Sequence, residues 1–195
     1  MTRLPPLPHA EWDMDALAVV APGRELPPSN ALGLFARHPA LATAFLTFNT
    51  HLLSRSSTLP ARTRELAILR VAWRRRCKYE WVQHLLIARK AGATDEEIAE
   101  VQKGSPTLLS RAVDELEVDG RISDPTYAEL SAEFDDRQLL DLVFTIGAYD
   151  LLAKAFNTFE VELDPGFDEP DFDAPIQDTA TQSTAIPHTV PNREG

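Results

Sequence analysis

The amino-acid sequence predicts an all-α fold, and two kinds of observation lead to this prediction. Apolar residues recur at the three- and four-residue spacing of helices, whereas no segment alternates apolar and polar residues convincingly as a half-buried strand would. Helix start and stop signals also lie at the ends of these segments. Thr94 with Glu97 three residues later, for example, is a capping-box pattern. We therefore expect seven to nine helices packed as a multi-helix bundle.

The expected elements follow the chain in order. Six prolines within the first 29 residues disfavour regular helix and predict an extended N-terminal arm, with at most a helical turn near Asp13 to Val20. Pro60 suits the first turn of a deeply buried helix, and the RRRC segment predicts a corner into a second helix that ends before Gly92. Helices are expected at about 30–37, 40–54, 60–73, 78–91, 94–103, 108–119, 123–134 and 136–159.

These elements divide the chain into three parts. The N-terminal arm covers residues 1–29, and the helical domain covers residues 30–164. From residue 165 to 195 the composition changes to acidic residues, prolines and small polar residues, which cannot bury much apolar surface. This last part is predicted to be a flexible tail, or an arm that wraps around a partner subunit.

Composition and charge exclude several classes of protein. The 195 residues are 44% hydrophobic, which is sufficient for a core, and the net charge of −11 opposes binding to nucleic acid or to anionic lipid. A single cysteine cannot form an intramolecular disulfide, and no secretory signal is recognised at the N-terminus, so a cytoplasmic protein is expected. No uninterrupted apolar segment reaches about 18 residues, so no membrane span is expected.

The stretch from Arg62 to Gly92 holds the candidate site. It contains the single cysteine, Cys77, followed by Glu80 and His84, and preceded by Glu65 twelve residues upstream. Residues three or four apart on a helix are neighbours, so a thiol, a carboxyl and an imidazole share one stripe. The flanking positions are mostly apolar, and this stripe is therefore expected to face the interior or a pocket.

The segment RELAILRVAWRRRCKYEWVQHLLIARKAGATDEEI resembles the carboxymuconolactone decarboxylase family, which includes the alkylhydroperoxidase D-like (AhpD-like) proteins. The resemblance implies an all-helical fold that assembles into homo-oligomers, as dimers, trimers or hexamers. In the AhpD branch a glutamate precedes a Cys-x-x-Cys-x-x-x-His segment, and here Glu65, Cys77 and His84 match the glutamate, the first cysteine and the histidine. Glu80 replaces the second cysteine, which removes the dithiol.

Each candidate residue also has a purely structural interpretation. Glu80 can accept a proton from His84 and leave the other imidazole nitrogen to exchange protons with a ligand, or the two can form an exposed helix-stabilising pair. Cys77 stands beside three arginines at a helix start, which lowers the pKa of a thiol, or it is an inert buried residue. Glu65 interrupts an apolar helix and is either part of the site or paired with an arginine.

Three functions follow from these residues together with what the family resemblance implies. The first is a cofactor-independent acid–base enzyme, of the decarboxylase or isomerase type, that acts on a small organic acid, lactone or related carbonyl compound through Glu65, Glu80 and His84, with Cys77 lining the pocket. The second is a one-cysteine thiol peroxidase, and the third is a non-catalytic oligomeric binding protein. Tyr79 and Trp81 are candidate pocket residues, or parts of the core. No metal-ligand spacing and no phosphate-binding loop is present, so no metal or cofactor is expected.

Overall fold

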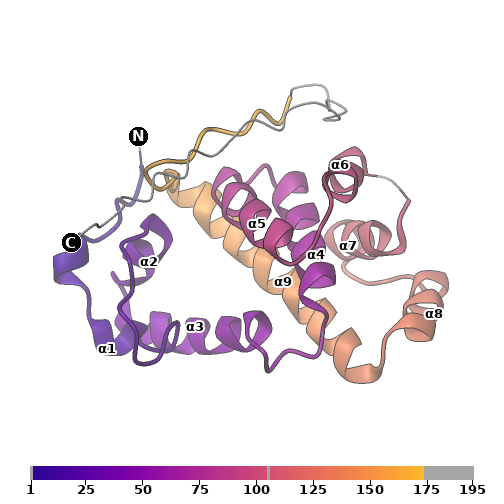
Figure 1. The fold of residues 1–195 in the computed structure, drawn as a ribbon, viewed down its shortest axis with the longest axis horizontal. Helices are drawn as coiled ribbons and strands as arrows, with labels where there is room; N and C mark the ends of the chain where they lie inside the picture. The colour runs from indigo at the N-terminus through magenta and orange to yellow at the C-terminus, as the bar shows by residue number, and fades with distance from the viewer. Residues whose placement is uncertain (1, 105, 174–195) are drawn as a thin grey trace, which may run out of the picture.

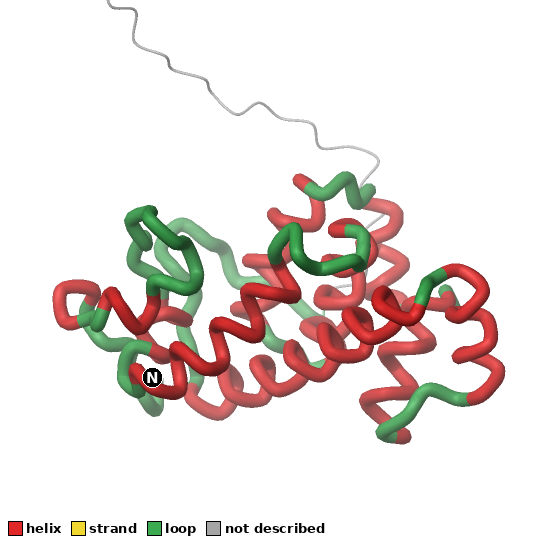
Figure 2. Tube along the Cα trace, turned by 90° about the horizontal axis from the view of Figure 1, so that it is seen from below, coloured by secondary structure: helices red, strands yellow, loops and turns green. Residues whose placement is uncertain are grey.

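The computed structural model describes residues 2–104 and 106–173, and over these residues the all-α prediction is confirmed. Figure 2 shows helices joined by loops, with no strand in the described chain. A short 3-10 helix, His9–Glu11, precedes nine α-helices. These are α1 (Met14–Leu17), α2 (Asn30–Phe35), α3 (Pro39–Leu53), α4 (Ala61–Arg74), α5 (Lys78–Lys90), α6 (Asp95–Lys103), α7 (Leu108–Asp119), α8 (Asp124–Glu133) and α9 (Asp136–Phe159).

Helix α4 is the centre of the bundle. It packs against α5, α6, α7 and α9, and all nine residues from Arg64 to Ala72 are buried. Figure 1 shows α1 to α3 at one end of the molecule, α6 to α8 at the other, and the long helix α9 passing close to α4 and α5. A helix that is apolar on nearly all sides needs neighbours on all sides, which is why α4 occupies this position.

The corner between α4 and α5 places the predicted site residues. Arg76 has a left-handed conformation, with φ of 51°, and the amide of Cys77 donates to the carbonyl of Ala72 at 2.9 Å. With the amide of Arg76 donating to Trp73 at 3.1 Å, this is a Schellman ending in which an arginine occupies the usual glycine position. The corner folds α5 back against α4, so that side chains of both helices meet.

The predicted N-terminal arm is packed against the helical domain. Trp12, Leu17 and Leu26 are buried together with residues of α2 and α3, including Ala42 and Leu46. Outside the 3-10 helix and α1, residues 2–29 have no regular secondary structure, as the prolines predicted. The apolar residues between the prolines hold the arm in place, because they bury surface against α3.

The segment after α9 and the first residues of the predicted tail, 165–173, pack against α4 and α5 of the same chain. Asp164 accepts hydrogen bonds from the Tyr79 hydroxyl at 2.7 Å and from the Gln83 amide at 2.9 Å, both on α5. Phe172 packs on Trp73, with ring centroids 4.8 Å apart. Figure 1 shows this segment turning back from the end of α9 on the side of α5. Residues 174–195, the rest of the predicted tail, lie outside the described residues.

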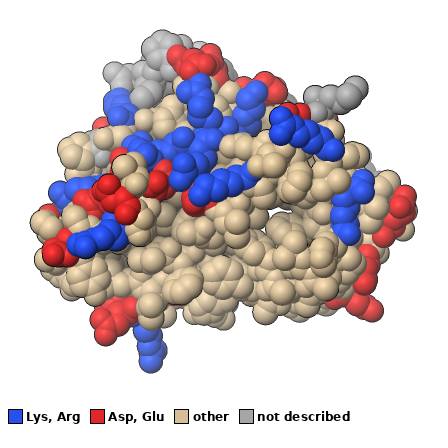
Figure 3. Space-filling model, turned by 180° about the vertical axis from the view of Figure 1, so that it is seen from behind, with Lys and Arg blue, Asp and Glu red and all other residues tan. Residues whose placement is uncertain are grey.

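One exposed face of α9 is uncharged. Leu140, Val143, Phe144, Gly147 and Leu151 are all exposed, and no charged residue of α9 between positions 140 and 151 is exposed to the same degree. Figure 3 shows the reverse side of the molecule, where charged side chains gather over the upper half and the edges, and a broad lower region is uncharged. A solvent-facing helix normally carries polar residues on its outer face.

Candidate active site

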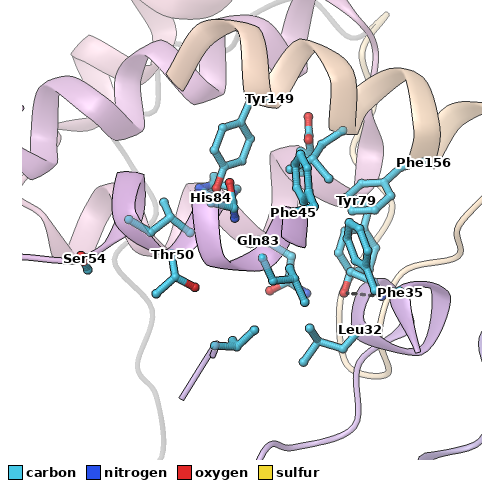
Figure 4. Close-up of a pocket in the computed structure, with 17 residues that line it drawn as sticks. Leu32, Phe35, Phe45, Thr50, Ser54, Tyr79, Gln83, His84, Tyr149 and Phe156 are labelled. Carbon is cyan, nitrogen blue, oxygen red and sulfur yellow. Dashed lines mark hydrogen bonds between the residues drawn. The ribbon is translucent and has the colours of Figure 1, made fainter. Parts of the chain in front are cut away.

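A pocket of about 320 Å³ lies between α3, α5 and α9, with α2 at its edge. This volume is at the lower end of the range for small-molecule sites. Most of its wall is apolar, and Figure 4 shows Phe35, Tyr79 and Phe156 gathered at one end, with Tyr149 pointing from α9 toward His84. The polar side chains of its lining are Asn49, Thr50, Ser54, Tyr79, Glu80, Gln83, His84 and Tyr149.

The imidazole of His84 is held from behind by Glu65. Nδ1 of His84 lies 2.7 Å from Oε2 of Glu65, a contact between α5 and the buried helix α4. A carboxylate accepts hydrogen bonds, so Nδ1 carries a proton, and in the neutral imidazole Nε2 is the acceptor. Nε2 makes no hydrogen bond within the described residues. Since His84 lines the pocket, its free nitrogen is the group available to a ligand.

Glu65 is paired on both oxygens. Its Oε1 accepts from Nε of Arg64 at 3.0 Å, and its Oε2 faces His84. Both members of the ion pair are buried, with the side chain of Glu65 0% exposed and that of Arg64 9% exposed. The sequence analysis considered an arginine as the partner of Glu65, and Arg64 is that partner. The same carboxylate also contacts His84. Glu65 is a positioning group for His84 as well as half of a buried ion pair.

The expected partnership of Glu80 with His84 is not formed. The sequence spacing placed Glu80 as the proton acceptor of His84, but the structure gives this role to Glu65 because α4 packs across the back of the imidazole. Glu80 lines the pocket and is 2% exposed, and neither of its carboxyl oxygens has a hydrogen bond of normal geometry. Burial raises the pKa of Glu80 well above its ordinary value, the thiol of Cys77 lowers it and nearby Asp150 raises it.

The raised pKa of Glu80 predicts how stability depends on pH. Between the unfolded value, about 4.3, and the higher folded value, the folded protein binds the extra proton, so stability falls as pH rises through this window. The contribution of Glu80 falls by up to about 1.4 kcal/mol per pH unit, whereas Glu80→Gln has no such proton. Urea unfolding of both proteins from pH 5 to 8 measures the difference in slope. Parallel stability curves would contradict the assignment.

Cys77 is beside the pocket and does not line it. It is the N-cap residue of α5, is 1% exposed, and borders a second hollow on the other side of Tyr79. Burial raises the pKa of the Cys77 thiol, the Glu80 carboxyl raises it further, and backbone hydrogen bonding at Glu80 acts in the opposite direction. Desolvation therefore outweighs the lowering considered from the sequence for the helix start and the neighbouring arginines, and the structure favours the alternative of a buried, inert cysteine.

The three arginines of the corner are engaged in ion pairs. Arg74 and Arg75 both pair with Glu117 on α7, and Arg76 pairs with Asp173. None of them lines the pocket. They stabilise the corner and leave the thiol without a cationic partner.

Tyr79 and Trp81 lie on different faces of α5. Tyr79 lines the pocket, and burial together with the hydrogen bond to Asp164 raises the pKa of its hydroxyl. Trp81 packs instead on Trp73 and Phe172, with ring centroids 5.0 Å and 6.2 Å away, in a separate hydrophobic cluster. Of these two candidates, only Tyr79 is a pocket residue in the structure.

Two residues that the sequence did not single out for the site complete its polar end. Tyr149 of α9 meets the ring of His84 edge-on, with centroids 4.7 Å apart and an interplanar angle of 86°. Burial raises the pKa of Tyr149, the carboxyls of Glu65 and Glu80 raise it further, and the Asn49 side chain acts in the opposite direction. Asn49 of α3 lines the pocket, and its buried Oδ1 has no partner. Neither residue belongs to a local motif.

Residues 2–104 and 106–173 contain no group of three or more His, Cys, Asp or Glu side chains arranged to hold a metal ion. No helix in this part of the chain is long and apolar enough to cross a membrane.

Residues 39–104, from the start of α3 to the end of α6, match the model described as the Carboxymuconolactone decarboxylase family. The resemblance seen in the sequence is thereby confirmed, and the matched segment contains Glu65, Cys77, Glu80 and His84. Tyr149 lies outside it.

Two solved structures share the fold. One is a protein of unknown function from Agrobacterium tumefaciens, proposed to be the antioxidant defence protein AhpD, with a TM-score of 0.58, 21% identity, and coverage of 67% of this chain and 94% of that chain. The other is an uncharacterized peroxidase-related protein from Silicibacter sp. TM1040, with a TM-score of 0.61, 18% identity, and coverage of 70% and 76%. At these identities the likeness establishes the fold alone. No curated protein matches the chain.

Proposed function

We propose that this protein is a cofactor-independent acid–base enzyme that moves a proton on a small organic acid, lactone or related carbonyl compound, in an isomerisation or a decarboxylation. One observation carries the proposal. A histidine held by a buried carboxylate and a second, unpaired carboxyl line the same apolar pocket. A base and an acid in different environments are what proton transfer next to a carbonyl requires.

The proposed step uses both groups. Nε2 of His84 takes a proton from the carbon next to the carbonyl, and the electron pair of the broken C–H bond moves toward the carbonyl oxygen. Glu80, kept protonated by burial, gives its proton to that oxygen, and an enol results. Return of a proton to another carbon completes an isomerisation. In a decarboxylation, the C–C bond to the carboxyl group breaks as CO₂ departs, and the electron pair of that bond moves toward the same carbonyl oxygen. Glu65 keeps the imidazole oriented throughout.

The experiment that tests this proposal does not need the natural substrate. Small ketones and lactones are incubated with the protein in D₂O, and proton NMR follows the exchange of hydrogen for deuterium next to the carbonyl. We expect exchange with wild-type protein and a loss of about 10²–10⁴-fold in Glu80→Gln, whose amide cannot supply the proton. Full exchange activity in Glu80→Gln, or none above background in the wild type, would overturn the mechanism.

Cys77 gives a separate prediction, because it distinguishes the thiol peroxidase from the acid–base enzyme. A peroxide-reactive thiol must be accessible and ionised, whereas Cys77 is buried and has a raised pKa. We expect intact-protein mass spectrometry after mild peroxide treatment to show no reversible oxidation, and Cys77→Ala to keep most of the exchange activity. A reversible gain of one oxygen on Cys77 would favour the peroxidase.

The same proposal includes a cytoplasmic homo-oligomer. The uncharged face of α9 supports a second copy as its cover, because Leu140, Phe144 and Leu151 are exposed there and a contiguous apolar face is typical of a protein–protein interface. Light scattering of the full-length chain measures the assembly, and a monomer would remove this part of the proposal.

A further inference from the structure

Unpartnered oxygen atoms are concentrated in the pocket. Six buried side-chain nitrogen or oxygen atoms in the described residues have no hydrogen-bond partner, and three of them are Oδ1 of Asn49 and both oxygens of Glu80. Both residues line the pocket, and Glu80 is only 2% exposed. Buried polar groups are nearly always hydrogen-bonded, so these atoms indicate a ligand with a polar oxygen at this end of the pocket.

The pocket lining offers no positive charge to an anion. No lysine or arginine is among the residues that line it. Arg64, the arginine bound to Glu65 behind His84, is itself paired with that carboxylate. A carboxylate moved from water into this site would meet no lysine or arginine, and it would lie beside the carboxyl of Glu80. His84 is the one basic side chain of the lining, and it is already paired with the carboxylate of Glu65. Burial of an unpaired charge is strongly unfavourable.

The apolar part of the lining is suited to an apolar body. The rings of Phe35 and Phe45 stack with centroids 5.5 Å apart and an interplanar angle of 12°, and both line the pocket together with Leu46 and Leu152. A cyclic or aromatic group can lie against these side chains while its oxygen reaches the polar end.

We propose that the ligand of this pocket is a neutral, largely apolar carbonyl compound, a cyclic or aromatic ketone or lactone, and that free carboxylates are excluded. Its oxygen lies at Glu80 and Asn49, and its body lies against Phe35 and Phe45. This inference rests on the proposed function. Among the compounds considered there it selects the neutral ones over organic acids, and it therefore selects isomerisation over decarboxylation.

The test uses two pairs of probes that match in shape and differ in charge. Acetophenone is compared with benzoate, and cyclohexyl methyl ketone with cyclohexanecarboxylate, by titration calorimetry and ligand-observed NMR on the full-length chain at pH 7.5. We expect each ketone to bind at least about tenfold more tightly than its acid. Equal or tighter binding of the acids overturns the inference, as does the absence of binding by either ketone up to its solubility limit.

Two sets of variants test the cause of this preference. Thr50→Lys places an ammonium group in the lining and is expected to improve benzoate binding about tenfold, whereas Leu41→Lys, at an exposed position on the opposite side of α3, is expected to leave it unchanged. Glu80→Gln keeps hydrogen-bonding groups and should bind acetophenone within about threefold of wild type, whereas Glu80→Leu should lose about tenfold. No gain in Thr50→Lys would contradict the charge argument, and no loss in Glu80→Leu would contradict the placement of the ligand oxygen.

The outcomes separate this inference from the proposed function. Ketone binding without hydrogen exchange would reject the enzyme and leave the ligand class standing. Hydrogen exchange with a preference for carboxylates would reject the ligand class and leave the enzyme standing.

Discussion

Replacing His84 with alanine is expected to lower the rate of hydrogen exchange next to a carbonyl by about 10²–10⁴-fold. The physical reason is that His84 is the histidine of the pocket lining, and Nε2 is its free nitrogen while Nδ1 is bound to Glu65. The measurement is the NMR exchange assay in D₂O. Circular dichroism and urea unfolding of the variant show whether the fold is retained.

Two further variants make this result specific. His84→Asn keeps an N–H in the place of Nδ1 but has no second ring nitrogen, so it should be as inactive as His84→Ala while retaining the contact with Glu65. His51→Ala is the control, because His51 is exposed on α3 and Asp141 keeps its hydrogen bonds from Ser57 and Thr58. Substantial exchange in His84→Asn would show that the base is another group.

The helices could be predicted from the sequence because their signals are local. The capping box of Thr94 and Glu97 is present in the structure, and α6 begins at the next residue, Asp95. Gly92 has a φ of 90° and follows α5 as expected. Apolar spacing and end signals depend on residues within a few positions of each other. They locate helices along the chain without fixing how two helices face each other.

The role of Glu65 as the partner of His84 could not be predicted from residues close in sequence. Glu80 is four residues before His84, so same-helix geometry made it the natural partner of the imidazole. The observed partner is Glu65, which comes from α4, and its position depends on the depth and rotation at which α4 and α5 pack. A carboxyl within an apolar helix was a usable signal that Glu65 has a buried partner. The identity of that partner required the packed structure.

Residues distant in sequence were the least predictable. Tyr149 and Asn49 reach the pocket from α9 and α3, and the apolar residues all around α9 gave no sign of which face turns inward. Trp81 could have been excluded as a companion of Tyr79, because residues two apart on a helix point in nearly opposite directions. The structure places them in separate surroundings, the pocket and the cluster with Trp73.

Replacing Glu65 with alanine is expected to lower the free energy of unfolding by about 3–5 kcal/mol, a large share of the stability of a typical domain. The change leaves the guanidinium of Arg64 buried with only a long contact of 3.4 Å to the carbonyl of Leu52, and it removes the partner of His84. Urea unfolding measures the loss.

A double-mutant cycle with Arg64→Met shows whether the stranded charge is the cause of that loss. If it is, Arg64→Met combined with Glu65→Ala is less destabilised than the sum of the single variants, because the uncompensated charge is gone. Glu65→Gln separates function from stability, since it keeps the shape of the side chain but cannot orient the imidazole as a carboxylate does. We expect it to lose exchange activity even where it remains folded. A loss of less than about 1 kcal/mol in Glu65→Ala would contradict this prediction, because it would mean that Arg64 finds water or another partner once the carboxylate is removed.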